Sequence, residues 1–402
     1  MNVALRDHFP LLRRRIDDRR IIYLDSAATS LKPASVLAAE QAYSTEFTAN
    51  VHRGKHTLSE EASQAYEHTR RRVARFINAD PDCVVFTANA TEALNLVAQG
   101  LPLPPTARVV APRHEHHANL VPWFRTAEVI VLPTEPTIPL DLNQLEDLLR
   151  SASPSVLTLA HASNVTGVIH PVAEICALAR RLGIVSVVDA AQSAPHLALD
   201  VEQLGCDFLA FSGHKMLGPT GVGVLWGQRD QLTRLDPLVL GGGAVDRVTS
   251  TGFTLKAVPH RFETGTPNIS GVIGLGRAID LLDEIGMSTV TAHDAVLAAA
   301  LEEQLRDMPG VDVLMARREP RLAIATVVPR TSRITPDHLA YYLSETHKIM
   351  VRSGHHCAHP LFDSIGAEAG GVRASAYLYN EVEEIQAMGA ALRELLGRVV
   401  GR

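Results

Sequence analysis

One lysine in this chain lies where short buried strands would hold it firmly. The sequence contains five lysines, and Lys215 follows an expected strand over residues 207–211 and precedes another over 222–226, with a Gly/Pro turn between. An earlier buried-looking strand over residues 184–188 ends at Asp189. The other four lysines, Lys32 beside a proline among them, have no such setting. The chain therefore combines a firmly held amine with an acid at a strand end.

This combination suits pyridoxal phosphate. That cofactor needs a lysine for a Schiff base, a carboxylate that keeps its pyridine nitrogen protonated, and donors for its phosphate. Alone, an aspartate at a strand end is common in open α/β sheets, and a lone lysine is usually a solvated surface residue. Ser212 and His214, which shortly precede the lysine, add side-chain donors, and together the residues favour the cofactor.

The turn over residues 87–92 joins an expected strand to an expected helix. Free backbone N–H groups and the positive end of the helix dipole gather near Ala90 and Thr91, so an anion would be well placed there. Alternatively, Asn89 or Thr91 only caps the helix. Capping and phosphate binding can coexist, so both interpretations stay open.

Cys357 differs from the other cysteines in its surroundings. It lies in a polar, loop-like segment with imidazoles on both sides and Arg352 nearby, an environment that favours a thiolate. A thiolate is a nucleophile. No CxxC pair is present, and we expect small buried thiols at the remaining positions, which are Cys83, Cys176 and Cys206.

Two histidine-rich runs raise the alternative of a metal site. They comprise His114, His116 and His117, and then His355, His356, Cys357 and His359. Neighbours in an extended segment point to opposite sides, and no aspartate or glutamate completes a recognised ligand spacing. The sequence therefore favours a site without metal.

The ordered motifs carry a family resemblance. The chain resembles class V aminotransferase-fold enzymes, and among them the cysteine desulfurases of the type that serves SUF iron–sulfur cluster assembly. The resemblance extends from residues 23–28 to 373–375, through segments 50–54, 115–119, 163–167, 212–215, 262–268 and 352–357. It implies an α/β, fold-type I pyridoxal phosphate-dependent transferase with a large, mostly parallel-sheet domain and a smaller α+β domain.

The resemblance also implies roles for individual residues. Lys215, Cys357 and His116 are the expected catalytic groups, with His116 stacked on the cofactor ring. The expected substrate-binding residues are Arg373, Arg352 and Asn164. The expected cofactor-binding residues are Ala90 through its backbone, Thr91, His116, Asn164, Asp189, Gln192, Ser212, His214, Lys215 and, from the partner subunit of a homodimer, Thr266. His52 and Arg53 are expected at the same two-fold interface.

The implied reaction converts L-cysteine to L-alanine and leaves a persulfide on Cys357, which supplies sulfur to an acceptor protein for iron–sulfur cluster or other assembly. Three alternatives stay open: a selenocysteine lyase, a class V aminotransferase or C–S lyase, and a non-catalytic persulfide carrier. The segment after the nucleophile, 363–371, is glycine-rich and acidic where relatives often carry bulky residues. The identity of the acceptor is therefore undetermined.

Composition is consistent with a globular enzyme. The chain has 46% hydrophobic residues and a mean hydropathy of +0.06. Its formal charge of −6 gives no electrostatic reason to expect nucleic-acid binding. No apolar run approaches the roughly 18 residues of a membrane helix, and no apolar signal region follows the N-terminal charges. We expect a cytoplasmic protein.

Two domains are expected, one over residues 21–280 and a smaller one formed by 1–20 and 281–402, which carries the cysteine loop. Strand-like runs alternate with helical patterns between residues 83 and 226, which predicts a mostly parallel sheet. Gly241 to Gly243 are expected to form a flexible loop. The elements expected later are helices at 269–285 and 291–308, a strand at 321–328, a helix at 336–346, strands at 349–351 and 372–378, and a helix at 381–396.

Overall fold

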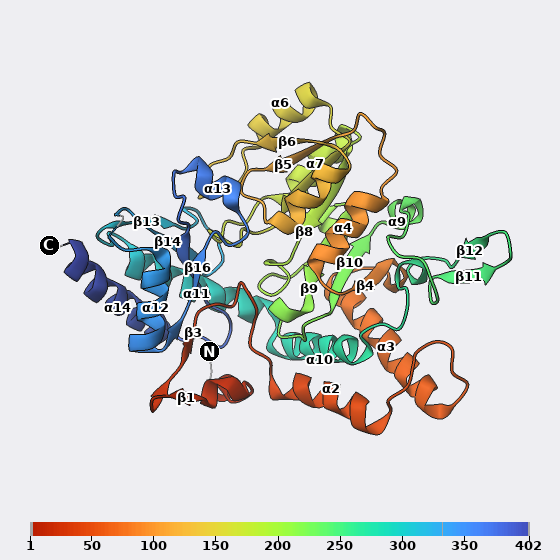
Figure 1. The fold of residues 1–402 in the computed structure, drawn as a ribbon, viewed down its shortest axis with the longest axis horizontal. Coiled ribbons are helices and arrows are strands. Elements are labelled where there is room, and N and C mark those ends of the chain that lie inside the picture. The colour runs from red at the N-terminus through yellow and green to blue at the C-terminus, as the bar shows by residue number, and fades with distance from the viewer. Residues whose placement is uncertain (1–2, 332, 401–402) are drawn as a thin grey trace.

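A seven-stranded sheet forms the centre of the larger part of the molecule (Figure 1). The computed structural model describes residues 3–331 and 333–400. The strand order is β4-β10-β9-β8-β7-β5-β6, with β10 antiparallel to both neighbours and every other pairing parallel. The strands are β4 (Val84–Thr87), β5 (Arg108–Pro112), β6 (Glu128–Leu132), β7 (Val156–Ala160), β8 (Val185–Asp189), β9 (Phe208–Ser212) and β10 (Gly223–Gly227). The expected mostly parallel sheet is confirmed.

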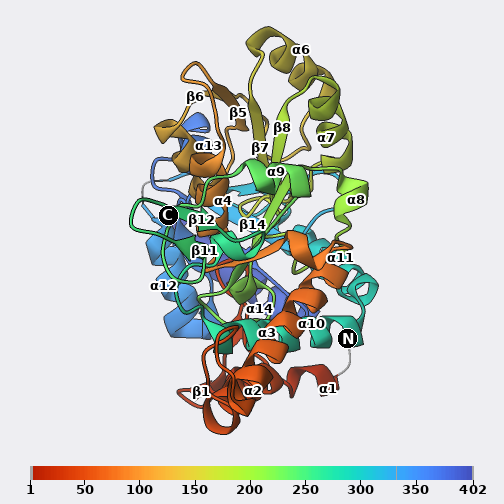
Figure 2. The same cartoon turned by 90° about the vertical axis from the view of Figure 1, so that its right-hand side faces the viewer.

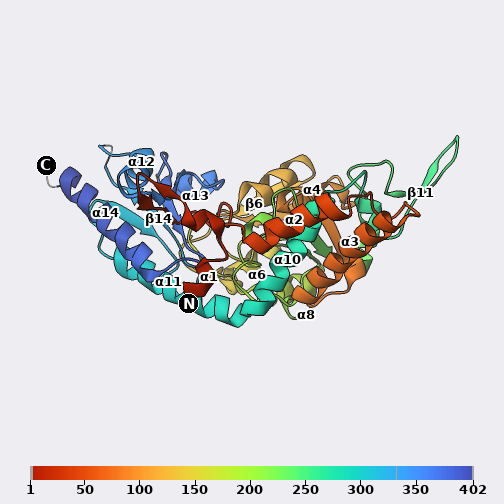
Figure 3. The same ribbon diagram turned by 90° about the horizontal axis from the view of Figure 1, so that it is seen from below.

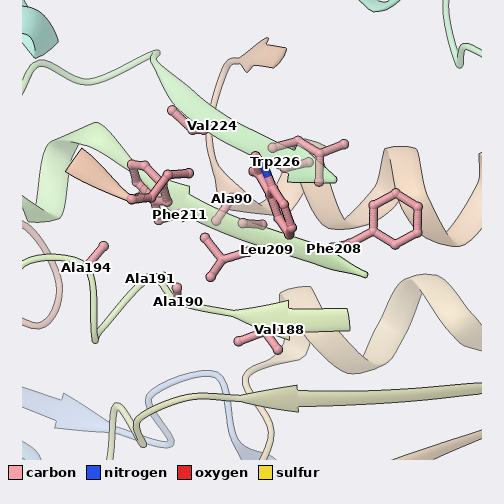
Figure 4. Packing of buried hydrophobic residues seen from close by; sticks show 14 of the residues in the cluster. Ala90, Val188, Ala190, Ala191, Ala194, Phe208, Leu209, Phe211, Val224 and Trp226 are labelled. Atoms are coloured by element: carbon pink, nitrogen blue, oxygen red, sulfur yellow. The ribbon is translucent and has the colours of Figure 1, made fainter. Parts of the chain in front are cut away.

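The central strands are apolar on both faces because helices cover both. Every residue of β7, β9 and β10 is buried, as is typical of a parallel sheet between two helical layers. Figure 4 shows Phe208, Leu209 and Phe211 of β9 and Trp226 of β10, which belong to the same hydrophobic core. Helix α4 (Ala90–Gly100) packs on β9 and β10, and α7 (Val172–Arg181) packs on β8.

Helix α10 (Ile269–Ile285) leads from the larger part of the molecule toward the smaller (Figure 3). It packs on α2 (Ala34–Glu46) and α3 (Thr57–Phe76). Helix α11 (Met287–Leu305) continues from it and packs on α14 (Val382–Val400). Its first residue lies four positions before the predicted start, since only Gly286 separates the two helices.

A four-stranded antiparallel sheet forms the smaller part. Its order is β13-β14-β17-β16, and α11, α12 and α14 pack with it around a second hydrophobic core. The elements are β13 (Val311–Leu314), β14 (Ile324–Pro329), β16 (Arg352–Gly354), β17 (Gly371–Ser375) and α12 (Pro336–His347). Beside them, β3 (Ile22–Tyr23) pairs in parallel with β15 (Ile349–Met350).

The residues just after the predicted boundary at 20/21 contact both cores. Leu24 lies in the second core and Ile22 packs against it, because β3 pairs with β15. Tyr23, between them, packs against the larger core. Residues 1–2, 332 and 401–402 of the expected small domain lie outside the described residues.

Two strands of the smaller part differ from the sequence prediction for local reasons. Strand β16 was not expected, because Arg352 to Gly354 show no apolar alternation. Strand β17 ends at Ser375, earlier than predicted, because the apolar residues that follow leave the sheet. Tyr377, Leu378 and Tyr379 pack instead in the larger core.

A hairpin formed by β11 (Val245–Val248) and β12 (Phe253–Leu255) projects from the larger part (Figures 1 and 3). Figure 2 shows the layers from the side, with α6 (Leu142–Ala152) and α7 beside the parallel strands.

Among the described residues, no helix combines the length and apolarity needed to span a membrane. The short elements are α1 (Val3–Arg6), α5 (His117–Leu120), α8 (Val201–Leu204), α9 (Arg229–Arg234), α13 (His359–Ser364), β1 (Arg15–Ile16), β2 (Arg19–Arg20) and the 3-10 turns Pro10–Arg13, Pro81–Cys83, Val121–Arg125, Gly213–Lys215 and His260–Phe262.

Candidate active site

A cavity of about 590 Å³ lies where the ends of β8 and β9 face residues of the smaller part. Ligands of open α/β sheets bind at this edge. The structure brings all but one of the predicted site residues to this cavity. Its lining includes Ala90, Thr91, His116, Asn164, Asp189, Gln192, Ser212, His214, Lys215, Arg352, Cys357 and Arg373.

Asp189 and Lys215 enter the cavity from neighbouring strands. Asp189 is the last residue of β8, and Lys215 ends the 3-10 turn that follows β9. Burial lowers the pKa of Lys215 to about 8, although the charge of Asp189 opposes this. Burial raises the pKa of Asp189, whose Oδ1 accepts a hydrogen bond from the Ala191 N–H at 2.8 Å. The lysine can therefore lose its proton more easily than a solvated lysine.

The turn that carries Lys215 is fixed through one carbonyl. The His214 carbonyl accepts from the Ser30 N–H at 2.9 Å and from the Lys32 Nζ at 2.8 Å. The Thr29 and Ser30 hydroxyls donate to the same oxygen. Lys32 was not among the predicted site residues, because a lysine before a proline gives no local signal. Burial nevertheless lowers its pKa to about 8.

The helix α4 N-terminus borders the cavity and is capped by Asn89, which accepts from the Glu92 N–H at 2.9 Å. Gly223 makes room for this turn, since a Cβ there would lie 2.5 Å from the Asn89 Cα. The Ala90 N–H donates to the Ser212 Oγ at 2.8 Å. This amide is thus already satisfied, so Thr91 is the better candidate for phosphate binding at this helix end.

His116 is held in one orientation. It caps α5, and its Nδ1 accepts from the Ala118 N–H at 3.1 Å, which places the ring proton on Nε2. Burial, reinforced by the charge of Lys215, lowers the pKa of His116 to about 3. A neutral imidazole therefore faces the cavity.

Two arginines share one carboxylate at the other side of the cavity. Arg352 donates to Asp25 through Nε at 3.2 Å and NH2 at 3.0 Å, and Arg373 donates to its Oδ1 at 3.3 Å. Arg373 is buried, and its Nε has no partner among the described residues. One net positive charge is left for a substrate carboxylate. Asp25 was not among the predicted site residues, although it lies in the motif at residues 23–28.

Two amides that the resemblance assigned to the cofactor make protein contacts. The Asn164 Nδ2 donates to the His356 carbonyl at 2.8 Å, and the Gln192 Nε2 donates to the Ala27 carbonyl at 2.9 Å. Both side chains still line the cavity. Asn164 therefore links the cavity wall to the turn that carries the cysteine.

Cys357 is exposed, whereas Cys83, Cys176 and Cys206 are buried, as predicted. Burial raises the pKa of all three buried thiols, that of Cys176 to about 12. Cys357 lines the same cavity as Lys215 and is near enough for its charge to affect the lysine's pKa. The cavity thus contains one accessible thiol beside a buried amine.

The histidines of the two runs lie in different surroundings, except that His117 of the first run contacts His359 of the second. His114 pairs with buried His170 at 3.0 Å between their Nε2 atoms, while His116 faces the cavity. The described part of the chain has one group with ligand atoms within 4.8 Å of one another, formed by His52, Glu67 and His260. Arg70 already donates to both oxygens of that carboxylate, so its charge is compensated and the group is a poor cation site.

Thr266 lies apart from this cavity. It lines a second cavity of about 230 Å³ together with His52 and Arg53. The Asn50 Nδ2 donates to its hydroxyl at 3.4 Å. Within one chain, the structure therefore does not bring Thr266 to Lys215.

The aminotransferase class-V family matches residues 22–388. The chain belongs to this family. It is 39% identical over 403 residues to a probable cysteine desulfurase of Halalkalibacterium halodurans, covering 97% of this chain and 98% of the relative. The cysteine desulfurase of Thermococcus onnurineus NA1, solved without ligand, superposes with a TM-score of 0.92 at 37% identity, covering 98% of both chains. An S-sulfonic acid form of the Escherichia coli cysteine desulfurase CsdA gives 0.87 at 34%, covering 99% of both.

Family membership confirms the predicted fold-type I architecture and the enzyme class. It also confirms pyridoxal phosphate as the cofactor, and the residues present fit that group. The cavity offers a carboxylate, an amine of lowered pKa and a helix N-terminus beside a neutral imidazole. The Lys215 Nζ makes no hydrogen bond to any described residue, so it is free to react.

Proposed function

We propose that this protein is a pyridoxal phosphate-dependent cysteine desulfurase. One observation carries the proposal: the exposed thiol of Cys357 lines the same cavity as Lys215 and Arg373. An aminotransferase needs no thiol there. Relatives at 37–39% identity that carry the cysteine desulfurase name support the same reaction.

Substrate binding follows from charge. The cysteine carboxylate pairs with Arg373 and Arg352, which Asp25 holds in place without cancelling both charges. The substrate's side chain then extends toward Cys357. Asn164 fixes the turn of that residue through the His356 carbonyl.

When bound, pyridoxal phosphate supplies an electron-withdrawing ring that acidifies the substrate's α-hydrogen and makes its C–S bond cleavable. Asp189, the buried carboxylate at the end of β8, would keep the ring nitrogen of the bound cofactor protonated. Lys215 would hold the cofactor covalently, and its amine of lowered pKa would accept the substrate's α-proton. Neutral His116 is placed to pass protons within the cavity.

Sulfur moves in one displacement. The Cys357 sulfur attacks the substrate sulfur, so an S–S bond forms while the substrate's C–S bond breaks and its electron pair goes to the carbon fragment. That fragment gains a proton and leaves as alanine. The sum is cysteine plus the Cys357 thiol giving alanine plus the Cys357 persulfide.

Incubation of the cofactor-loaded protein with L-cysteine tests this function. In the absence of a reductant, we expect one alanine for each persulfide formed, measured by amino-acid analysis and by mass spectrometry of Cys357. A dithiol should then allow continuous turnover. Pyruvate and ammonia as the products would identify a C–S lyase and contradict the proposal. Parallel turnover of selenocysteine measures which of the two substrates is preferred.

We also propose that the active species is a cytoplasmic homodimer in which Thr266, with His52 and Arg53, completes the site of the partner subunit. The separate cavity that contains these three residues supports this. The persulfide on exposed Cys357 can then be passed to the thiol of a sulfur-acceptor protein for iron–sulfur cluster assembly.

Mixed dimers test the shared site. We expect that a dimer of one Lys215→Ala chain and one Thr266→Ala chain regains about half the wild-type activity, because one of its two sites then contains both intact residues. Each variant alone serves as the control. Mixed dimers no more active than the two parent variants would show that Thr266 acts within its own chain.

A further inference from the structure

Three imidazoles form a column next to the turn that carries Cys357. The His359 ring stacks on His117, with ring centroids 4.9 Å apart and an interplanar angle of 11°. It also stacks on His355, at 4.2 Å and 16°. His117 begins α5 in the larger part, whereas the other two rings flank Cys357 in sequence. The column therefore joins the cysteine segment to the larger part of the molecule.

The three histidines of the column also make hydrogen bonds that hold the cysteine segment. The His117 N–H donates to the Cys357 carbonyl at 2.8 Å. In return, the His117 Nε2 accepts from the His359 N–H at 3.3 Å and lies 3.2 Å from the His359 Nδ1. The His355 Nε2 lies 2.8 Å from the Glu368 carbonyl oxygen. Each ring of the column thus has a fixed partner.

The turn between these rings has a backbone conformation that needs such support. His356 has φ +49° and Cys357 has φ +57°, two consecutive non-glycine residues in the left-handed region. Each such residue is strained and persists only where its surroundings hold it. Two carbonyls of the turn are held from the larger part, that of His356 by Asn164 and that of Cys357 by His117.

We propose that His359 is a positioning residue for Cys357. By stacking between His117 and His355 and hydrogen-bonding to His117, it keeps the strained turn docked so that the thiol faces the substrate sulfur. This inference rests on the proposed function only in that Cys357 is the thiol that attacks the substrate sulfur. The docking itself is independent of substrate and cofactor.

Two variants separate the contributions of the ring and of its nitrogen. His359→Ala removes both the stacking and the Nδ1 contact, whereas His359→Asn retains a short side-chain donor toward His117. The exposed His68 on α3 provides a matched control, His68→Asn. Thermal unfolding of all variants reports whether each one folds.

In His359→Ala, hydrogen exchange at the amides of 117 and 357–359 should become about fivefold faster or more, the factor expected for loss of one hydrogen bond. Single-turnover formation of alanine should slow by a similar factor, while the cysteine concentration for half-saturation stays unchanged. His359→Asn should recover part of both losses, and His68→Asn should match the wild type.

Faster exchange without slower single turnover would make the column merely structural and overturn the proposal. Wild-type exchange in His359→Ala would overturn it as well. If the wild-type protein formed no alanine at all, the proposed function would fail, while the exchange data would still report on the docking.

Discussion

Lys215→Ala is expected to lower alanine formation from cysteine by about 10³-fold or more, since the variant loses both the covalent link to the cofactor and the group that takes the α-proton. The fold should persist, because the Lys215 Nζ makes no hydrogen bond with the described residues. Borohydride treatment followed by peptide mass spectrometry should find the cofactor attached to residue 215 in the wild type and attached nowhere in the variant.

Lys55→Ala is a suitable control, because Lys55 is exposed and lies outside the cavity lining. The lowered pKa of Lys215 adds a second measurement. A neutral amine is the nucleophile that captures the cofactor, so covalent loading of the cofactor-free protein should accelerate as pH rises through about 8. Loading that does not change between pH 6.5 and pH 9.5, or covalent attachment at Lys32 in Lys215→Ala, would contradict this assignment.

The strands that position Asp189 and Lys215 were predictable because each is a short apolar run with a polar residue at its end. In the structure, β8 and β9 end within one residue of the predicted strand ends. A parallel sheet brings these ends to one edge, so the cavity at that edge follows from local patterns. The ordered motifs then supplied the roles that spacing alone left open.

The supporting residues could not be found in this way, because they act over long sequence separations. Asp25 accepts hydrogen bonds from Arg352 and Arg373, which lie more than 300 residues later in the chain. Lys32 donates to the His214 carbonyl, which lies 182 residues later. Such contacts leave no periodic signal. Asn164 is the converse case: its position was predicted, but its amide holds the His356 carbonyl.

The distribution of the four cysteines allows the sulfur chemistry to be tested separately from cofactor chemistry. Three thiols are buried, and burial raises their pKa, which leaves Cys357 as the one cysteine exposed for attack on substrate sulfur. After the wild type reacts with cysteine, mass spectrometry should find added sulfur on Cys357 and on none of the buried thiols.

Cys357→Ser should retain the cofactor and still change its absorbance when cysteine is added, because Lys215, Asp189 and Arg373 remain. Alanine release should fall by about 10³-fold or more, since an alcohol with a pKa far above that of a thiol cannot accept sulfur as a persulfide. Cys176→Ser serves as a comparison for loss of a buried thiol. If Cys357→Ser produced alanine at the wild-type rate, the sulfur would leave without attack by this residue and the proposed displacement would be wrong. Pyruvate and ammonia in place of alanine would instead identify β-elimination.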